Sequence, residues 1–96
     1  MAKLTFTYGN RPVPPGLEVA IHWEGYSSWT GRAHTRLHTD DSGSVHVDDT
    51  LIDSTGSRPE RIWVRDPEGG SAVYYVGIWL SRGRDYELPI EAARRQ

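Results

Sequence analysis

Hydrophobic and polar residues alternate along most of this chain. The alternation is clearest at residues 17–24 and 29–39. Because successive side chains of a β-strand point to opposite faces, this pattern predicts strands that are buried on one face only. Shorter alternating runs predict further strands at residues 4–8, 45–47, 61–65 and 86–90.

One segment, residues 72–80, is apolar at both odd and even positions, which predicts a strand covered on both faces. A small two-layer domain supplies only one cover. The second cover is expected to be a partner subunit, or residues 48–60 folding across. Those residues are polar and rich in turn formers, and Leu51 and Ile52 are expected at the rim of the core.

A β-hairpin is predicted over residues 36–48. Asp41, Ser42 and Gly43 form the expected three-residue loop, with Gly43 at positive φ. This register places His38 opposite His46 on the outer face of the hairpin.

Seven strands spaced by turn signals predict an all-β chain folded as a single antiparallel β-sandwich of about seven strands. The length of 96 residues fits one domain. Residues 1–91 are expected to form it, and residues 92–96 to form a polar C-terminal tail.

Two stretches within residues 9–47 carry a family resemblance. Asn-Arg-Pro-Val-Pro-Pro-Gly-Leu-Glu-Val-Ala-Ile is followed by Leu-His-Thr-Asp-Asp-Ser-Gly-Ser-Val-His-Val. This resembles the transthyretin-like, carboxypeptidase regulatory-like and Cna B-type group of β-sandwiches. The resemblance implies a transthyretin-like or Ig-like Greek key. It also implies a non-catalytic module for adhesion, spacing or binding.

Some B-type members join an early-strand lysine to a last-strand Asn or Asp through an isopeptide bond. Lys3 is the only lysine, and Asp85 is the remaining candidate partner. Asp85 falls in a predicted turn, so the bond is not expected here.

Composition narrows the function classes. The net charge is −2, which favours neither nucleic acid nor a membrane surface as a partner. The absence of cysteine excludes disulfides and thiolate metal sites. No apolar run approaches the ~20 residues of a membrane span. The first residues lack the apolar region of a signal peptide, so a cytoplasmic location is expected unless a leader has been removed.

Candidate chemistry is sparse. His38, His46 and Asp40 share one face of the predicted hairpin and offer a nitrogen and oxygen ligand set for Zn²⁺. The alternative is three solvated polar side chains on a sheet face, so no cofactor is predicted. The serines fall in turns without a paired base, and we therefore expect no enzyme activity.

Large aromatic residues are the favoured binding groups. Trp23, Tyr26 and Trp29 surround one loop, although the alternation of Trp23 with Ile21 also fits a core position. Trp63, Tyr74 and Trp79 come from later strands and form a second candidate interface.

These features leave three hypotheses open. The first is a protein-interaction or structural module that binds a protein partner or itself through loops, a sheet edge such as the strand with Pro89, or an oligomer interface. The second is a carbohydrate-binding module that uses Tyr26 and Trp29 to hold a glycan. The third is a small metal-dependent enzyme.

Overall fold

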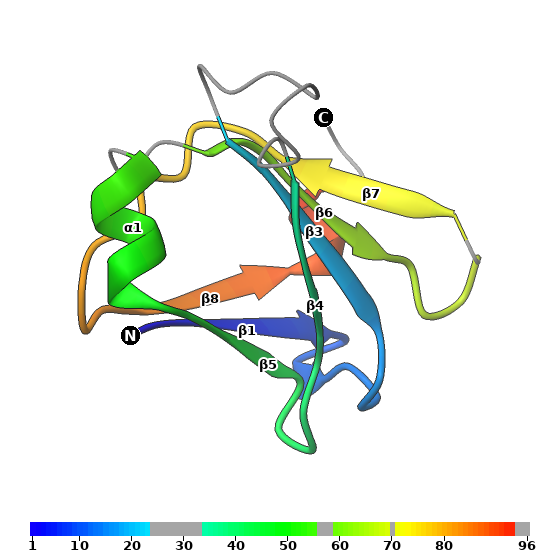
Figure 1. Ribbon diagram of the computed structural model, residues 1–96. Coiled ribbons are helices and arrows are strands. Elements are labelled where there is room, and N and C mark those ends of the chain that lie inside the picture. The colour runs from blue at the N-terminus through cyan, green and yellow to red at the C-terminus, as the bar shows by residue number, and fades with distance from the viewer. Residues whose placement is uncertain (24–33, 56–58, 70, 94–96) are drawn as a thin grey trace.

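The computed structural model describes residues 1–23, 34–55, 59–69 and 71–93. Within this part of the chain, eight strands and two short helices are present, and the strands form two sheets (Figure 1). The chain is therefore mostly β and two-layered, as the alternation predicts.

Sheet A is built around β1 (Ala2–Tyr8). β2 (Arg11–Pro12) and β5 (Ser44–Val47) pair antiparallel with different halves of β1. β8 (Asp85–Pro89) pairs with β1 in parallel. This parallel pair corrects the expectation of an entirely antiparallel sandwich.

Sheet B has the strand order β4-β3-β6-β7, and all of its pairs are antiparallel. Its strands are β3 (Glu18–Trp23), β4 (His34–His38), β6 (Pro59–Arg65) and β7 (Ala72–Tyr75).

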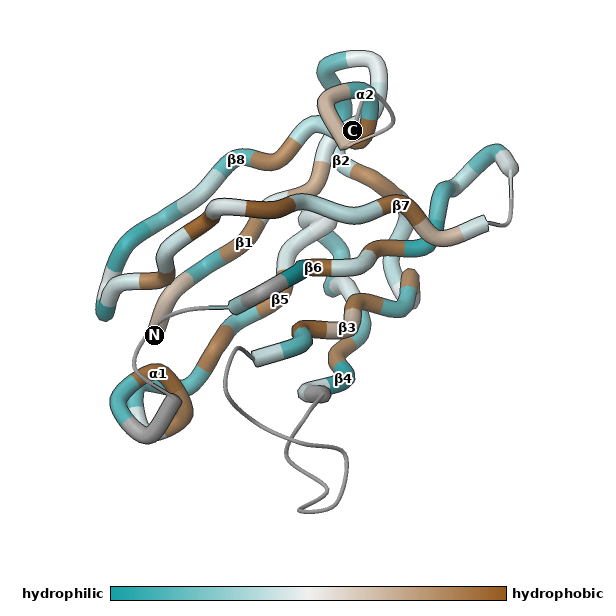
Figure 2. Tube along the Cα trace, turned by 90° about the horizontal axis from the view of Figure 1, so that it is seen from above, coloured by the Kyte–Doolittle hydropathy of each residue, from teal (hydrophilic) through white to brown (hydrophobic). Residues whose placement is uncertain are grey.

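The core lies between the two sheets. Phe6 of sheet A and Tyr75 of sheet B are both buried, with ring centroids 6.0 Å apart. The Tyr75 hydroxyl donates to the carbonyl oxygens of Leu88 (3.1 Å) and Pro89 (2.8 Å), which ties β7 to β8. Figure 2 shows hydrophobic residues concentrated in the strands and hydrophilic residues in most of the connecting turns. The buried hydrophobic residues are Ala2, Leu4, Phe6, Val13, Val19, Ile21, Trp23, Val45, Val47, Ile52, Ile62, Val64, Tyr75, Leu80, Leu88, Ile90 and Ala93.

The predicted hairpin at residues 36–48 is wrong in its pairing. β4 pairs with β3 in sheet B, whereas β5 pairs with β1 in sheet A. His38 is therefore the neighbour of Glu18, and His46 is the neighbour of Lys3. Alternation reports which face of a strand is buried, and it does not report which strand lies beside it. We call residues 39–43, where the chain crosses between the sheets, the arch (Figure 1).

The arch is held by hydrogen bonds. The Thr39 side-chain oxygen accepts from the Leu17 N–H (2.9 Å) and donates to the Pro14 carbonyl (2.8 Å). The Thr39 backbone also donates to the Leu17 carbonyl (2.9 Å) and accepts from the Gly16 N–H (2.8 Å). Thr39 is buried, so these bonds join the end of sheet B to the loop before β3.

Gly43 fixes the other end of the arch. Its φ is +73°, as the turn signal predicts, and its carbonyl accepts from the Phe6 N–H at 2.9 Å. A Cβ atom here would lie 2.9 Å from the Val13 nitrogen and 3.1 Å from the Phe6 oxygen. The backbone of β1 and the loop after β2 thus leaves room for glycine only.

Residues 48–60 contain a helix that the turn-rich pattern did not predict. α1 (Asp49–Thr55) begins after Asp48, whose carboxylate accepts from the Thr50 N–H at 3.0 Å in an N-cap arrangement. Ile52 is buried and Leu51 packs against the core, which confirms the expected place of these two side chains.

The predicted strand at residues 72–80 is too long. β7 ends at Tyr75, and Gly77 follows with a φ of +74°, which ends the extended backbone. Val76 and Trp79 are exposed, so this segment is not a strand in need of two covers.

The C-terminal part returns to the core. Among the described strands, β8 pairs only with β1 and is an edge strand, as Pro89 suggests. α2 (Ile90–Ala93) then buries Ile90 and Ala93. Ala93 is packed, although the sequence predicts a polar tail from residue 92; residues 94–96 lie outside the described residues.

The substitution Gly43→Ala tests the arch. The left-handed backbone costs a non-glycine residue about 1–2 kcal/mol, and overpacking adds about 1–3 kcal/mol. We expect the free energy of unfolding in urea to fall by about 3 kcal/mol.

Gly83→Ala is the matched control. Gly83 has a φ of +66°, but a Cβ atom there meets nothing within 4 Å. This variant should lose only the backbone cost, about 1–2 kcal/mol. Equal losses in the two variants would show that the arch does not pack tightly against β1.

Candidate functional site

The outer face of sheet B carries the most distinctive side chains of the described surface. Ile62 and Val64 are buried in the core, so Trp63 between them points outward. Trp63 lies directly opposite Tyr74 of β7. On its other side, Trp63 lies opposite Ala20 of β3. The Ala20 side chain is small and does not rise beside the indole ring.

Trp63 and Tyr74 contact each other and a cation. Their ring centroids are 4.9 Å apart and their planes are inclined by 50°. The guanidinium carbon of Arg61 lies 5.0 Å from the Tyr74 centroid and 5.8 Å from the Trp63 centroid. These are cation–π distances, so the two rings hold the arginine side chain against the sheet. We call Arg61, Trp63 and Tyr74 the aromatic cluster.

The surroundings of the aromatic cluster are mainly basic. Strand register places Arg36 beside Ala20 and Glu18 beside His38 on the same outer face. Arg36 lies 3.7 Å from the Glu18 carboxylate, which is the one acidic side chain that the register places on this face in the described part of the chain. The described basic residues of the face are His22, Arg36, His38, Arg61 and Arg65.

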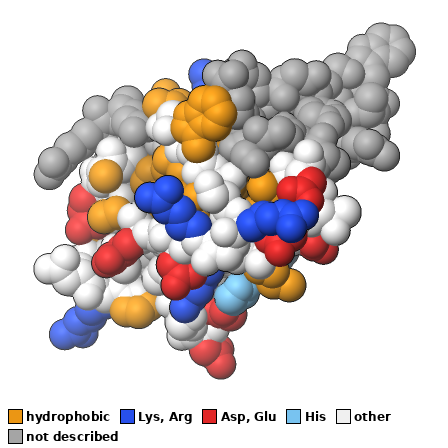
Figure 3. Space-filling model, turned by 90° about the vertical axis from the view of Figure 1, so that its left-hand side faces the viewer, with side chains coloured by type: hydrophobic (Ala, Val, Ile, Leu, Met, Phe, Trp, Pro, Cys, Tyr) orange, Lys and Arg blue, Asp and Glu red, His pale blue; other side chains and the backbone are white. Residues whose placement is uncertain are grey.

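The side of the molecule that includes α1 has a different charge distribution. Figure 3 shows the side that includes α1, where acidic and basic side chains are interspersed. On α1 itself, Asp53 bonds to Arg82, and this hydrogen bond lowers the pKa of Asp53. The side that includes α1 therefore does not share the mainly basic character of the outer face of sheet B.

The described residues show no binding site at the first predicted aromatic group, Trp23, Tyr26 and Trp29. Trp23 is fully buried, and its indole N–H donates to the Thr35 hydroxyl at 2.8 Å. Its core position follows the alternation with Ile21, and it corrects the inclusion of Trp23 among the binding residues. Tyr26 and Trp29 lie outside the residues that the structure describes.

The second predicted group is brought together in part. Trp63 and Tyr74 meet, whereas Trp79 lies beyond the end of β7 with 55% of its surface exposed. The Trp79 carbonyl accepts from the Tyr86 hydroxyl at 2.7 Å, which fixes the segment between β7 and β8. Trp79 is therefore not part of the β7 strand on which Tyr74 lies.

The proposed Zn²⁺ ligands are divided between the sheets. His46 on β5 lies 3.5 Å from the Asp40 carboxylate, while His38 ends β4 in the other sheet. In the described residues, no three His, Cys, Asp or Glu side chains are grouped closely enough to hold a metal ion. The predicted grouping of His38 with His46 is wrong because it depends on a hairpin pairing of β4 with β5 that the structure does not contain.

The Asp40 carboxylate accepts hydrogen bonds that stabilise the arch. Its Oδ1 accepts from the Ser42 hydroxyl (2.8 Å), the Ser42 N–H (2.9 Å) and the Ser44 N–H (3.0 Å). Led by the Ser42 hydroxyl and the Ser44 N–H, these bonds lower the pKa of Asp40 to about 2. Ser44 also bonds to Thr5 of β1 at 2.8 Å, so the network joins the arch to sheet A.

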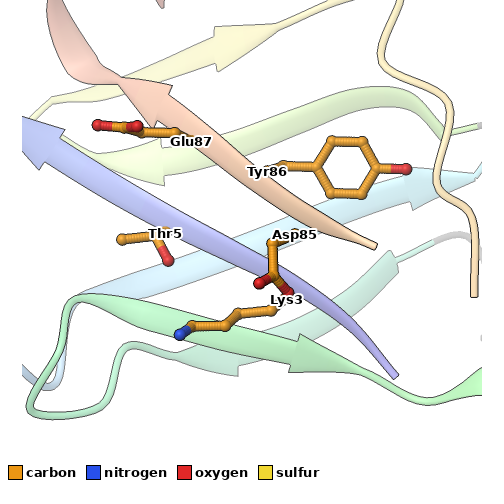
Figure 4. A pocket seen from close by; sticks show the side chains of 5 residues that line it. All are labelled: Lys3, Thr5, Asp85, Tyr86 and Glu87. Atoms are coloured by element: carbon orange, nitrogen blue, oxygen red, sulfur yellow. The ribbon is translucent and has the colours of Figure 1, made fainter. Parts of the chain in front are cut away.

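A depression of about 310 Å³ lies on the outer face of sheet A. Lys3 and Thr5 line it from β1, and Asp85, Tyr86 and Glu87 line it from β8 (Figure 4). Lys3 and Asp85 are register partners of the parallel pair, so Asp85 opens a strand and does not lie in a turn.

The aromatic cluster could be found from sequence only in part. The run Arg61-Ile62-Trp63-Val64-Arg65 shows that both arginines share a strand face with the tryptophan. The neighbour of Trp63 could not be read, because strand order depends on contacts across the whole core.

Comparison with known proteins adds no identification. The chain matches no family model, no curated protein and no solved structure. No helix in the described residues is long and apolar enough to cross a membrane.

The Asp40 network predicts a dependence of stability on pH. Because folding lowers this pKa from 3.8 to about 2, the stabilisation is complete above pH 3.8 and is lost as the pH falls toward 2. Asp40→Asn does not titrate, so its unfolding free energy in urea should fall less between pH 4 and pH 2 than that of the wild type. Parallel pH profiles would contradict the assigned role of this carboxylate.

Proposed function

We propose that this chain is a non-catalytic protein-binding module whose interface is the outer face of sheet B. The observation that carries the proposal is the aromatic cluster. Trp, Tyr and Arg are the residue types that contribute most to binding energy at protein interfaces. Here one of each lies in mutual contact on an outward sheet face.

The geometry of the cluster favours a protein over a glycan. Sugar rings stack on an open, flat aromatic face. Trp63 and Tyr74 are inclined by 50° and share the guanidinium of Arg61, so they do not form a flat platform. A protein surface can instead pack around all three side chains and place polar groups against the arginine.

The sheet face is also favoured over the edges formed by β8 and β7. β8 ends in Pro89, which has no N–H to offer to an added strand. β7 has only four residues, which limits the number of hydrogen bonds that it can offer at its edge.

We also propose that the strands connect as in the transthyretin-like Greek keys. In support, the consecutive strands β4, β5 and β6 alternate between the two sheets. This connection leaves the outer face of sheet B free of any described helix in Figure 1.

Affinity capture from a lysate of the source cells tests the proposed function. A partner retained by the wild type should be lost with Trp63→Ala, because truncation removes an interface anchor and the support of Arg61. Trp79→Ala is the matched control, since it removes an exposed tryptophan outside the cluster, and it should retain the partner.

Circular dichroism checks that neither variant is unfolded, and the melting curves of both should stay cooperative. Equal capture by Trp63→Ala and the wild type would contradict the proposal. So would turnover of a substrate by the isolated chain.

A further inference from the structure

Arg61 lies against two aromatic rings, whereas Arg84, which also has no ion pair with a described residue, lies against the single ring of Tyr86. Arg36 has the Glu18 carboxylate 3.7 Å away, and Arg82 bonds to Asp53. No ion pair between described residues involves Arg61, which lies against two aromatic rings. Within the described part of the chain, ring faces and no carboxylate lie against its charge.

The rings also orient the guanidinium group. Packing against Trp63 and Tyr74 restricts the side chain, while a guanidinium that is stacked on rings keeps its N–H groups in its own plane. A restrained arginine loses less conformational freedom when it binds. A carboxylate can then accept two parallel hydrogen bonds from it.

A second arginine lies near the aromatic cluster on β6. Arg61 and Arg65 lie on the same face of β6, four residues or about 13 Å apart. Carboxylates spaced by four residues on an extended partner segment match that separation. Two charges at this separation suit discrete carboxylates better than a nucleic acid, whose phosphates follow one another about every 3.4 Å along each strand.

We infer that the outer face of sheet B binds an extended protein segment rich in Asp and Glu, with Arg61 receiving a carboxylate. This inference rests on the proposed function and names the chemistry of the partner. Arg61 is the anchor, and Arg65 contributes a second positive charge along the same strand.

The test uses a fluorescein-labelled peptide of four Glu-Gly-Ser-Gly repeats, which places a carboxylate at every fourth residue. In fluorescence anisotropy at low salt, the wild type should bind it, and Gln in place of each Glu should abolish binding. Arg61→Gln should raise the dissociation constant at least fivefold, and Arg61→Lys should restore binding only in part. Arg82→Gln removes the same charge outside the face and should change the constant less than twofold.

The outcomes separate the two proposals. Equal binding of the Glu and Gln peptides, an unaffected Arg61→Gln variant or tighter binding of single-stranded dT16 would overturn the inference. A different result would be a partner captured through Trp63 whose binding neither Arg61→Gln nor competition by the acidic peptide reduces. That result would overturn the inference while the proposed function stands. Dimerisation abolished by Trp63→Ala would assign the face to a second copy and would also overturn it.

Discussion

The crossing of the chain from sheet B to sheet A at the arch is the constraint on which the rest of the structure depends. Thr39 is buried and makes four hydrogen bonds to the loop before β3, each worth about 1 kcal/mol. Asp40 and Gly43 then fix the turn against sheet A. If β4 and β5 paired directly, the two sheets would be joined through these strands and would not be separate layers.

The arch also decides what faces solvent. Because β4 stays with β3, the inner faces of both sheets meet in one core that includes Phe6 and Tyr75. Alternation then sends Trp63, Tyr74 and Arg61 to the far side of sheet B. The aromatic cluster is thus a consequence of the two-sheet arrangement, and it is held by contacts within a rigid sheet. Interface residues on a rigid sheet lose little freedom on binding.

The sequence predicts well which face of each strand is buried, and it predicts poorly which strands pair with each other. The inward positions of Val19 and Ile21, the positive φ of Gly43 and the burial of Ile52 follow from local patterns. The pairing of β5 with β1 does not, because both candidate partners of β5 present suitable alternation. The helix α1 does not follow from local pattern either, because the many turn formers around its N-cap residue Asp48 favour a loop. The candidate site followed the same rule: the outward direction of Trp63 was readable, and its contact with Tyr74 required the strand order.

Nuclear Overhauser effects between backbone protons test the arch most directly, because they report which strands are neighbours. The structure predicts cross-strand effects between Leu4 and Val45 and between Val19 and Leu37, with none between Leu37 and Val47. Effects between Leu37 and Val47, with none between Leu4 and Val45, would show a hairpin in a single sheet and would contradict the account.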